Sequence, residues 1–323
     1  MGGSPTGGIS ADAVAVQADA VRAGGALVVV GDVVTDVVAV HTEPLAPATD
    51  TAARIRILPG GAGANAACWA ARADPSAGRR GAEVRLLARV GAEWAGWHER
   101  ALAAAGVRAH LVVDPVEPTG TVVALVDKDT ERTFLTDSGA ALRLCPADWM
   151  PALLDGAAHL HLSGYLYFAE GSRELAGLAL GSALARGVPV SVDPASAGFL
   201  ATVGVKRFLK AADGASVLLP NEDEARLLAG TEDVAAAAAA LSRRFPLVVV
   251  TRGAAGALVA EGGAVTAEVP GEPARAVDST GAGDAFTGGF LAARLAGAPP
   301  VAAAGAGCRA GALAVTRLGG RPA

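Results

Sequence analysis

Short apolar segments alternate with helix-forming segments through the second half of the chain, and this alternation limits the fold more than any other feature. The apolar segments have the length of strands and lie at residues 159–162, 188–192, 216–219 and 247–250. The helix-forming segments between them lie at residues 172–186, 222–229 and 232–244. Alternation of this kind is typical of a parallel sheet that is covered by helices. The sequence therefore predicts an α/β fold.

The first half of the chain adds strands that do not follow this alternation. Residues 36–58 and 107–137 contain short strands joined by turns, and those of the second segment look antiparallel. We expect both segments to form a small β-strand lid on one α/β core. Residues 1–24 read as a flexible extension, and residues 25–323 as a single domain, because no repeat or linker interrupts them.

Composition excludes several classes of protein. Hydrophobic residues make up 52% of the chain and supply a core, while the net charge of −5 does not favour nucleic acid or an anionic membrane as a partner. No segment has the roughly 20 continuous apolar residues that a membrane span needs, and no signal peptide is recognisable. The three cysteines, which form no CxxC pair, predict reduced thiols and a cytoplasmic protein.

The segment VDSTGAGDAF, residues 277–286, leads into a predicted helix over residues 285–296. Gly281, Ala282 and Gly283 are small, so the unpaired N–H groups at the helix start can hold an anion, most often phosphate. A carboxylate at Asp284 repels that phosphate unless it takes a proton from the group that attacks it. An ordinary first-turn acid is the alternative. Asp278, six residues earlier, and a second glycine-rich segment favour the catalytic interpretation.

That second segment, GGAGAN at residues 60–65, fits the GxGxxA pattern of a dinucleotide site. Pro59 and Gly60 separate it from the preceding strand, however, and Glu83, the acid about 20 residues later, begins the next strand instead of ending it. We therefore discount NAD(P). The other interpretation is a close approach of the backbone to a polyhydroxylated ligand, with the Asn65 amide as donor and acceptor.

Polar residues follow several of the predicted strands, where ligands bind in α/β sheets. Asp36 can accept hydrogen bonds from two sugar hydroxyl groups, although a solvated turn acid is the alternative. Asn221 can cap the next helix, and with Glu224 it offers oxygens to a hydrated Mg²⁺. The loop after residue 250 is made of small residues, which lets a flat or phosphorylated ligand approach the backbone.

Other signals are weaker or missing. His159 and His161 lie on one face of a strand at a spacing that suits a metal, but no third ligand lies nearby, so core histidines are favoured. The sequence contains no GxxxxGK[ST] and no GxSxG motif, which argues against a P-loop enzyme and a serine hydrolase.

In order, these segments resemble the signatures of the ribokinase-like, or PfkB, family of sugar and nucleoside kinases. Residues 60–65 resemble its first signature, and DSTGAGD at 278–284 resembles the second, DTxGAGD, which is highly specific. NEDE at 221–224 matches the NxxE motif, and TRGAAG at 251–256 matches the nucleotide loop. The resemblance runs from about residue 26 to the end. It implies a three-layer α/β core with a mainly parallel central sheet, a small β-lid, and phosphoryl transfer from ATP, with Mg²⁺, to a hydroxyl.

The resemblance also implies a role for each motif residue. Asp284 matches the general base, and the transferred phosphoryl is held by Gly281, Ala282 and Gly283. Acceptor-binding positions are matched by Asp36, Gly61 and Asn65. Asn221 and Glu224 match the residues that organise Mg²⁺ and phosphate through water. Thr251, Gly253 and Gly256 match the nucleotide loop. A loop for a monovalent cation, K⁺, would start at Asp278 and Thr280 and be completed by the carbonyls of Val315, Leu318 and Gly320.

The acceptor stays open at this point. Ala62 and Val34 stand where ribokinases proper carry a lysine and an asparagine, and residues 163–165 replace a stretch that supplies an acidic residue, so ribose is disfavoured. The HLSG run at 161–164 is similar to 2-keto-3-deoxygluconate kinases, whereas small residues near Ala62 equally admit a nucleoside such as pseudouridine. An acceptor with a carboxylate would need an arginine, for which the candidates are Arg89, Arg132 and Arg173.

The leading hypothesis is an ATP-dependent kinase that phosphorylates a hydroxyl of a small sugar or sugar-like molecule. A non-catalytic ligand sensor on the same scaffold is the second, and the joint presence of Asp284, the glycine turn and NxxE argues against it. An NAD-dependent oxidoreductase is the third. The predicted partner is a small molecule, with no nucleic acid and no membrane, and the resemblance allows a homodimer through the lid.

Overall fold

The computed structural model describes residues 25–72, 81–127 and 132–322, and the predicted extension over residues 1–24 lies outside them. Its core is a nine-stranded sheet with the order β13-β12-β11-β10-β9-β8-β1-β4-β5. The strands are β1 (Ala26–Val30), β4 (Val84–Gly91), β5 (Val107–Asp114), β8 (Ala157–Ser163), β9 (Val190–Asp193), β10 (Val217–Leu218), β11 (Leu247–Thr251), β12 (Ala257–Glu261) and β13 (Ala264–Val269). From β5 across to β11 they are parallel, and β12 and β13 continue the sheet antiparallel.

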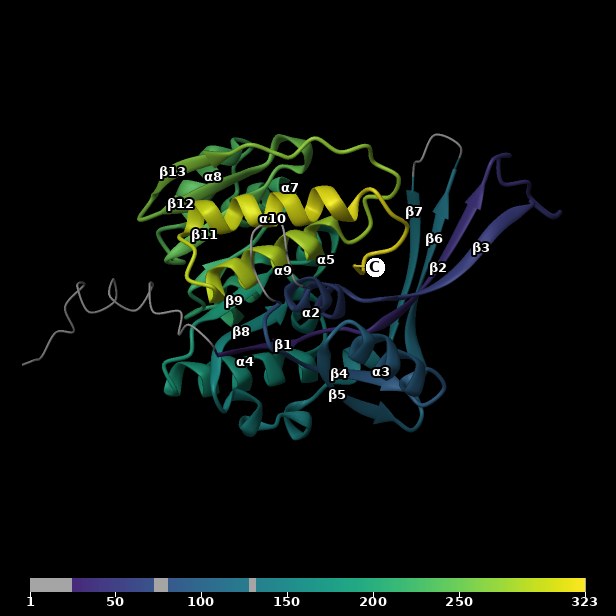
Figure 1. The fold of residues 1–323 in the computed structure, drawn as a ribbon, viewed down its shortest axis with the longest axis horizontal. Coiled ribbons are helices and arrows are strands. Elements are labelled where there is room, and N and C mark those ends of the chain that lie inside the picture. Colours follow the sequence, from purple (N-terminus) through teal and green to yellow (C-terminus); the bar gives the residue numbers. More distant parts are fainter. Residues whose placement is uncertain (1–24, 73–80, 128–131, 323) are drawn as a thin grey trace, which may run out of the picture.

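Helices cover both faces of this sheet (Figure 1), which confirms the predicted three-layer α/β core. One face is covered by α4 (Glu170–Ala185), α5 (Ala197–Val203), α6 (Val205–Ala211), α7 (Glu222–Ala229) and α8 (Val234–Leu241). The other is covered by α2 (Ala62–Ala71), α3 (Ala95–Ala104), α9 (Ala282–Leu295) and α10 (Pro300–Ala314). Short 3-10 helices are η2 (Ala140–Arg143), η3 (Pro146–Asp148), η4 (Pro151–Leu154), η5 (Gly164–Tyr167) and η6 (Gly253–Ala255).

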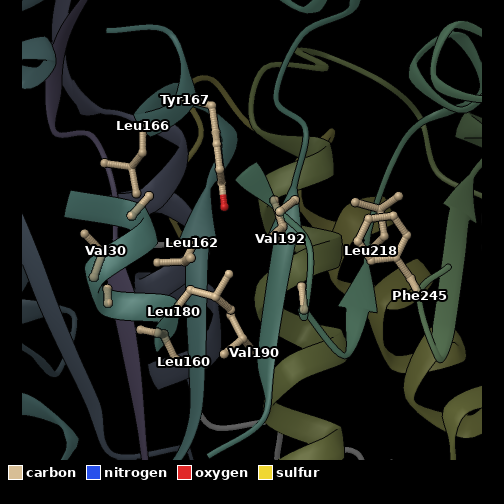
Figure 2. Packing of buried hydrophobic residues seen from close by; sticks show 14 of the residues in the cluster. Val30, Leu160, Leu162, Leu166, Tyr167, Leu180, Val190, Val192, Leu218 and Phe245 are labelled. Carbon is tan, nitrogen blue, oxygen red and sulfur yellow. The ribbon is translucent and has the colours of Figure 1, made fainter. Parts of the chain in front are cut away.

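Successive side chains of each parallel strand point to opposite faces, so each strand supplies two hydrophobic cores. On β1, Val28 and Val30 join the core beneath α4, while Leu27 and Val29 join the core beneath α9. Figure 2 shows the first core, where side chains from four neighbouring strands project together, among them Val30, Leu160, Leu162, Val190, Val192 and Leu218. Burial on both faces explains why these strands read as continuous apolar runs in the sequence.

Glycines let three helices pack closely on the face that carries the catalytic motifs. A Cβ added to Gly288 of α9 would lie 2.5 Å from the carbonyl oxygen of Ala66 and 2.6 Å from the Cβ of Trp69, both on α2. A Cβ added to Gly307 of α10 would lie 2.8 Å from the ring of Phe286 on α9. Side chains at these positions would force the helices apart, so the glycines set the distance of α9 from both neighbours.

A second, four-stranded sheet stands beside the core and forms the lid (Figure 1). Its order is β3 (Ala53–Gly60), β2 (Val34–His41), β6 (Thr119–Val126) and β7 (Arg132–Gly139). The outer pairs are antiparallel, and the central pair of β2 and β6 is parallel. A small buried cluster on one face of this sheet contains Val38, Ala124 and Val126.

The predicted lid segment 107–137 was wrong in its first part. Strand β5 does not join the lid but pairs in parallel with β4 in the large sheet, from Val84↔Val107 to Gly91↔Asp114. The physical reason is the connection: helix α3 lies between the two strands, and a strand–helix–strand crossover returns the chain in the same direction. The short turn at residues 115–118 therefore joins two sheets, and only β6 and β7 form the predicted antiparallel pair.

Two further expectations concern helices and thiols. None of the helices within the three described stretches combines the length and the apolar character that crossing a bilayer requires. Cys68 and Cys308 are buried and Cys145 is half-buried, and all three are free thiols.

A serine lies between two histidines in the middle of the central sheet. His159 Nε2 and His161 Nδ1, both on β8, each lie 2.9 Å from the Oγ of Ser191 on β9. A hydroxyl has a single proton, so at least one imidazole donates to it. Burial lowers the pKa of both histidines to about 3, which means that they are neutral inside the fold. The two histidines are therefore buried core residues that share the Ser191 hydroxyl, as the sequence favoured.

This pair should make the fold sensitive to acid. The unfolded histidines titrate near pH 6.5 and the folded ones near 3, so between these values the unfolded state binds more protons and stability falls as the pH falls. We expect a loss on the order of 1–2 kcal/mol for each histidine between pH 7 and pH 5. Urea unfolding at both pH values measures it. His161→Phe should reduce this pH-dependent loss of stability. The control Leu160→Ala removes a neighbouring side chain that does not titrate, so it should lower stability equally at both pH values. An unchanged loss in His161→Phe contradicts the assignment.

Candidate active site

A pocket of about 900 Å³ lies at the carboxyl edge of the large sheet. It is lined by four residues that end a parallel strand or follow one within three positions, namely Asp32, Asp193, Asn221 and Thr251. The carboxyl ends of parallel strands meet at one edge, which is where α/β sheets bind ligands. The lid closes another side with Val34, Asp36, Val122, Phe134, Thr136 and Ser138.

The glycine turn before α9 offers free N–H groups to this pocket. Gly281 has a φ of 73°, and a Cβ there would lie 2.5 Å from the Cα of Gly320, so only glycine fits. The N–H groups of Gly283 and Asp284, in the first turn, donate to no acceptor among the described residues. Gly281 and Gly283 line the pocket. The N–H group of Ala282 is not free for a ligand, because it donates to the carbonyl of Ser279 at 3.2 Å. The predicted anion seat is therefore open at residues 283 and 284.

Asp284 is held by a residue from the other end of the sequence. The Nδ2 of Asn65, near the start of α2, donates to Asp284 Oδ2 at 2.8 Å. Burial raises the pKa of Asp284 well above its usual range, and the negative charges of Asp193, Asp32 and Asp36 raise it further. The hydrogen bond from Asn65 lowers the pKa and so opposes part of this shift. A carboxylate in this setting binds a proton readily, as a general base must.

Asp36 faces the same pocket from the lid strand β2. Only 7% of its surface is exposed, and its carboxylate accepts no hydrogen bond from the described residues. Burial raises the pKa of Asp36 to about 7. The positive charge of Arg321 lowers this pKa, while the negative charges of Asp32 and Asp278 raise it. Gly60 packs against its carboxylate so closely that a Cβ there would overlap it. The pocket thus brings Asp36, Gly61 and Asn65 together with Asp284, as the sequence predicted for acceptor residues.

Asn221 and Glu224 form a reciprocal cap at the start of α7. Glu224 N donates to Asn221 Oδ1 at 2.9 Å, while the backbone N and Nδ2 of Asn221 donate to the two Glu224 oxygens at 2.9 and 2.8 Å. Both side chains line the pocket. The pKa of Glu224 is raised by burial and by Asp193, whose own pKa burial raises in turn. These facing carboxylates repel each other, and a hydrated Mg²⁺, which prefers such oxygens, would relieve that repulsion.

The predicted nucleotide loop is only partly at the pocket. Thr251, at the end of β11, lines it, but Gly253 and Gly256 do not. Gly256 has a φ of 95°, and a Cβ there would overlap the carbonyl oxygen of Val269 at the end of β13. The tight turn explains this glycine without a ligand.

The oxygens predicted to bind K⁺ are mostly in use. The Asp278 carboxylate accepts from the N–H groups of Thr280 and Gly319, each at 2.8 Å. The carbonyl of Val315 accepts from the backbone N–H groups of residues 277 and 278, at 2.7 and 3.1 Å, and that of Gly320 accepts from Trp69 Nε1 at 2.8 Å. Both lone pairs of the Val315 carbonyl are engaged in this arrangement, so that carbonyl would have to give up a hydrogen bond to hold a cation. The cation site formed by these residues and Leu318 stays a prediction.

Two carboxylates at the pocket were missed from the sequence. Asp32 follows β1 and caps α2: it accepts from Ala62 N at 2.8 Å and from Gly63 N at 3.1 Å. Asp193 ends β9 and accepts from Thr287 Oγ1 at 3.3 Å. Asp32 lies two residues after β1 and Asp193 is the last residue of β9, so the rule that ligands bind at the carboxyl ends of buried strands could have found both positions.

An aromatic wall was also missed. Tyr165, in the 3-10 helix η5 that follows β8, and Phe199 on α5 line the pocket, with ring centroids 5.8 Å apart. Phe168 stacks on Phe199 at 4.7 Å, and Phe134, half-exposed on the lid, lines the pocket as well. The pKa of Tyr165 is raised by burial and by several pocket carboxylates, Asp32 foremost. Phenylalanines scattered over three segments leave no local sequence signal.

No basic side chain is among the described residues that line the pocket. Of the predicted arginines, Arg89 is paired at 2.9 Å with both Asp114 and Asp148, outside the pocket. Arg173 donates to the carbonyl of Tyr167 at 3.2 Å. The side chain of Arg132 lies outside the described part of the structure.

Comparisons with known proteins agree with this arrangement. The sequence profile described as pfkB family carbohydrate kinase matches residues 25–323. A fructokinase from Klebsiella pneumoniae is 33% identical over 280 residues, which cover 83% of this chain and 84% of that protein. A ribokinase structure from Thermotoga maritima superposes with a TM-score of 0.75 at 26% identity, covering 93% of this chain and 96% of that one.

A similar fold is found in an adenosine kinase from Sinorhizobium meliloti, with a TM-score of 0.81, 22% identity and coverage of 93% and 96% of the two chains. At this identity the likeness concerns the fold alone. The match of the family profile over almost the whole chain, together with the fructokinase relative, decides the assignment: the chain belongs to the pfkB family of carbohydrate kinases.

Proposed function

We propose that this protein transfers the γ-phosphoryl group of ATP to a hydroxyl of an uncharged sugar or nucleoside, with Asp284 as the general base. One observation carries the proposal: the Asp284 carboxylate, held at 2.8 Å by Asn65, lies beside the free N–H groups of the α9 start and in one pocket with Asp36. The base, the anion seat and a carboxylate that can bind hydroxyls are thus together.

In this reaction the acceptor oxygen forms a bond to the γ-phosphorus as the bond between that phosphorus and the β,γ-bridging oxygen breaks, and ADP leaves. Asp284 takes the hydroxyl proton, which its buried position favours. The N–H groups of Gly283 and Asp284 hold the migrating group, since phosphoryl transfer depends on positioning and charge neutralisation. Mg²⁺, held through water by Asn221 and Glu224, would neutralise phosphate charge.

An uncharged acceptor is favoured over a sugar acid. The described lining includes the carboxylates of Asp32, Asp36, Asp193, Glu224 and Asp284 and no basic side chain. A carboxylate on the acceptor would find repulsion and no partner there. The relatives are named for uncharged acceptors, fructose and ribose, and the adenosine kinase for a nucleoside.

The compartment and the oligomeric state belong to the same proposal. Three free thiols and ATP as the donor favour the cytoplasm. On the outer face of the lid, opposite to Asp36 and Phe134, the strand register aligns Ile57, Val37, Val123 and Leu135 in one row. Ile57 and Leu135 are 50% and 58% exposed, and the neighbouring Ile55 is 62% exposed. We infer that a second copy covers this apolar strip.

Replacing the base tests the reaction. Asp284→Asn should lower kcat by about 10²–10⁴-fold while the KM values for ATP and acceptor change little, because the amide cannot take the proton. Steady-state ADP release measures both constants. Asp223→Asn makes the same chemical change on an 81% exposed side chain of α7 and should leave kcat unaltered. A kcat near that of the unmodified protein in Asp284→Asn would refute the assignment.

An acceptor screen tests the charge argument. D-fructose, D-ribose, adenosine and cytidine should include at least one that releases ADP faster than the acceptor-free background. Gluconate and 2-keto-3-deoxygluconate should not exceed that background, because the pocket repels their carboxylates. A sugar acid as the best acceptor contradicts the neutral class. If no acceptor raises ADP release above the background, the result favours the hypothesis of a non-catalytic ligand sensor.

The lid contact is tested by one pair of variants on β3. Ile57→Asp should convert a dimer to a monomer in light scattering, since a carboxylate in the apolar strip cannot be desolvated. Arg56→Asp, the next residue and on the opposite face, should leave the dimer intact. A monomeric unmodified protein at tens of micromolar contradicts the inference.

A further inference from the structure

Arg321 is half-buried, and its guanidinium lies beside Gly60 on the acceptor side of the pocket without lining the pocket. The last segment runs from α10 toward the lid, as the yellow trace in Figure 1 shows. The Nη2 of Arg321 donates to the carbonyl of Gly60 at 3.0 Å. Its Nε and Nη1 atoms are buried and have no hydrogen-bond partner among the described residues.

A guanidinium in this setting is costly to the fold. Burial of a charge without full pairing typically costs several kcal/mol, so arginines are rarely left this way without a local use. Burial lowers the pKa of Arg321, whereas Cys68 and Asp36 favour its charged form. Of these two groups Asp36 faces the pocket, which points to the acceptor side as the place where this charge acts.

Gly60 connects the arginine to that carboxylate. Its carbonyl accepts from Arg321, and its Cα packs directly on the carboxylate of Asp36, where a Cβ would overlap all three carboxyl atoms. The next residue, Gly61, has a φ of 100° and lines the pocket. Moving the Gly60 carbonyl would therefore move both Asp36 and Gly61.

Arg321 is itself fixed from two sides. The Gly320 carbonyl accepts from Trp69 Nε1 at 2.8 Å, and Gly319 N donates to the buried carboxylate of Asp278 at 2.8 Å. The other charged groups that act on Asp36 are acidic: Asp32 after β1 and Asp278 before α9, while Asp36 in turn acts on Asp284 in α9. Arg321 is the cation that opposes them.

We propose that Arg321 is a positioning residue for the acceptor: it fixes Gly60 and supplies the positive charge that Asp36 faces, so that Asp36 accepts hydrogen bonds from acceptor hydroxyl groups. The role concerns acceptor binding and not the transfer step. It rests on the proposed kinase activity, and the two can be tested separately.

The test compares Arg321→Met, Arg321→Lys and Arg317→Met with the unmodified protein. The acceptor is whichever of D-fructose, D-ribose, adenosine and cytidine gives the fastest ADP release. Arg321→Met should raise the acceptor KM by about 10-fold or more, as expected when a charge-assisted contact of about 1.5–3 kcal/mol is lost, and change kcat and the ATP KM by less than about 3-fold. Arg321→Lys should recover part of the affinity. Arg317→Met removes a cation from the same segment and should change nothing.

Two readouts separate positioning from a general loss of structure. Raising the pH from 7 to 9 should lower the acceptor KM of Arg321→Met toward that of the unmodified protein, because Asp36 then ionises without the arginine. Calorimetric titration of that acceptor without ATP should show the same loss of affinity. If Arg321→Met does not fold, both measurements can be made with Arg321→Lys, for which we expect an intermediate loss of acceptor affinity.

An acceptor KM that is unchanged in both variants, or an ATP KM that rises as much as the acceptor KM, overturns the proposal. Failure of the kinase assignment looks different, since the unmodified protein then turns over no acceptor at all. Asp284→Asn provides the opposite pattern, with kcat lost and acceptor affinity kept.

Discussion

The hydrogen bond between Asn65 and Asp284 is the contact on which the rest of the site depends. It joins side chains 219 positions apart at 2.8 Å, and it fixes the orientation of the proposed base. It forms only because α2 and α9 lie unusually close, which Gly288 permits. Binding, anion seat and proton acceptor are therefore properties of one helix pair, and a larger residue at 288 would disturb all three while touching none of them.

Much of this arrangement could be predicted from short sequence patterns. Strand–helix alternation predicted the parallel sheet, and the glycine turns predicted the helix starts. Asp36 does line the pocket, but from inside the lid strand β2 and not from the end of a buried core strand. Partners that depend on tertiary contacts could not be predicted. Strand β5 has the half-exposed pattern of a lid strand, and only its pairing with β4 assigns it to the core. The cap by Asp32, the engaged carbonyl of Val315 and the aromatic wall have no local signature.

The electrostatics of the pocket are one-sided. Five carboxylates line the described part of the pocket, and burial together with their mutual repulsion raises the pKa values of several of them. Arg321, the cation that acts on Asp36, does not line the pocket. Such a site is strained when empty of cations and is relieved by Mg²⁺ and by hydroxyl donors. In the proposed reaction, the carboxylates that would make Asp284 a good proton acceptor would also favour an uncharged acceptor that arrives together with a metal-bound nucleotide.

The segment 319–321 packs between β3, α2 and the α9 turn, through Leu58, Trp69 and Gly281. One short piece of chain therefore touches a lid strand, a helix that carries Asn65 and the turn that precedes Asp284. A shift of the lid would reach the glycine turn through this segment, without passing through a bound ligand. The lid and the turn would then change shape together.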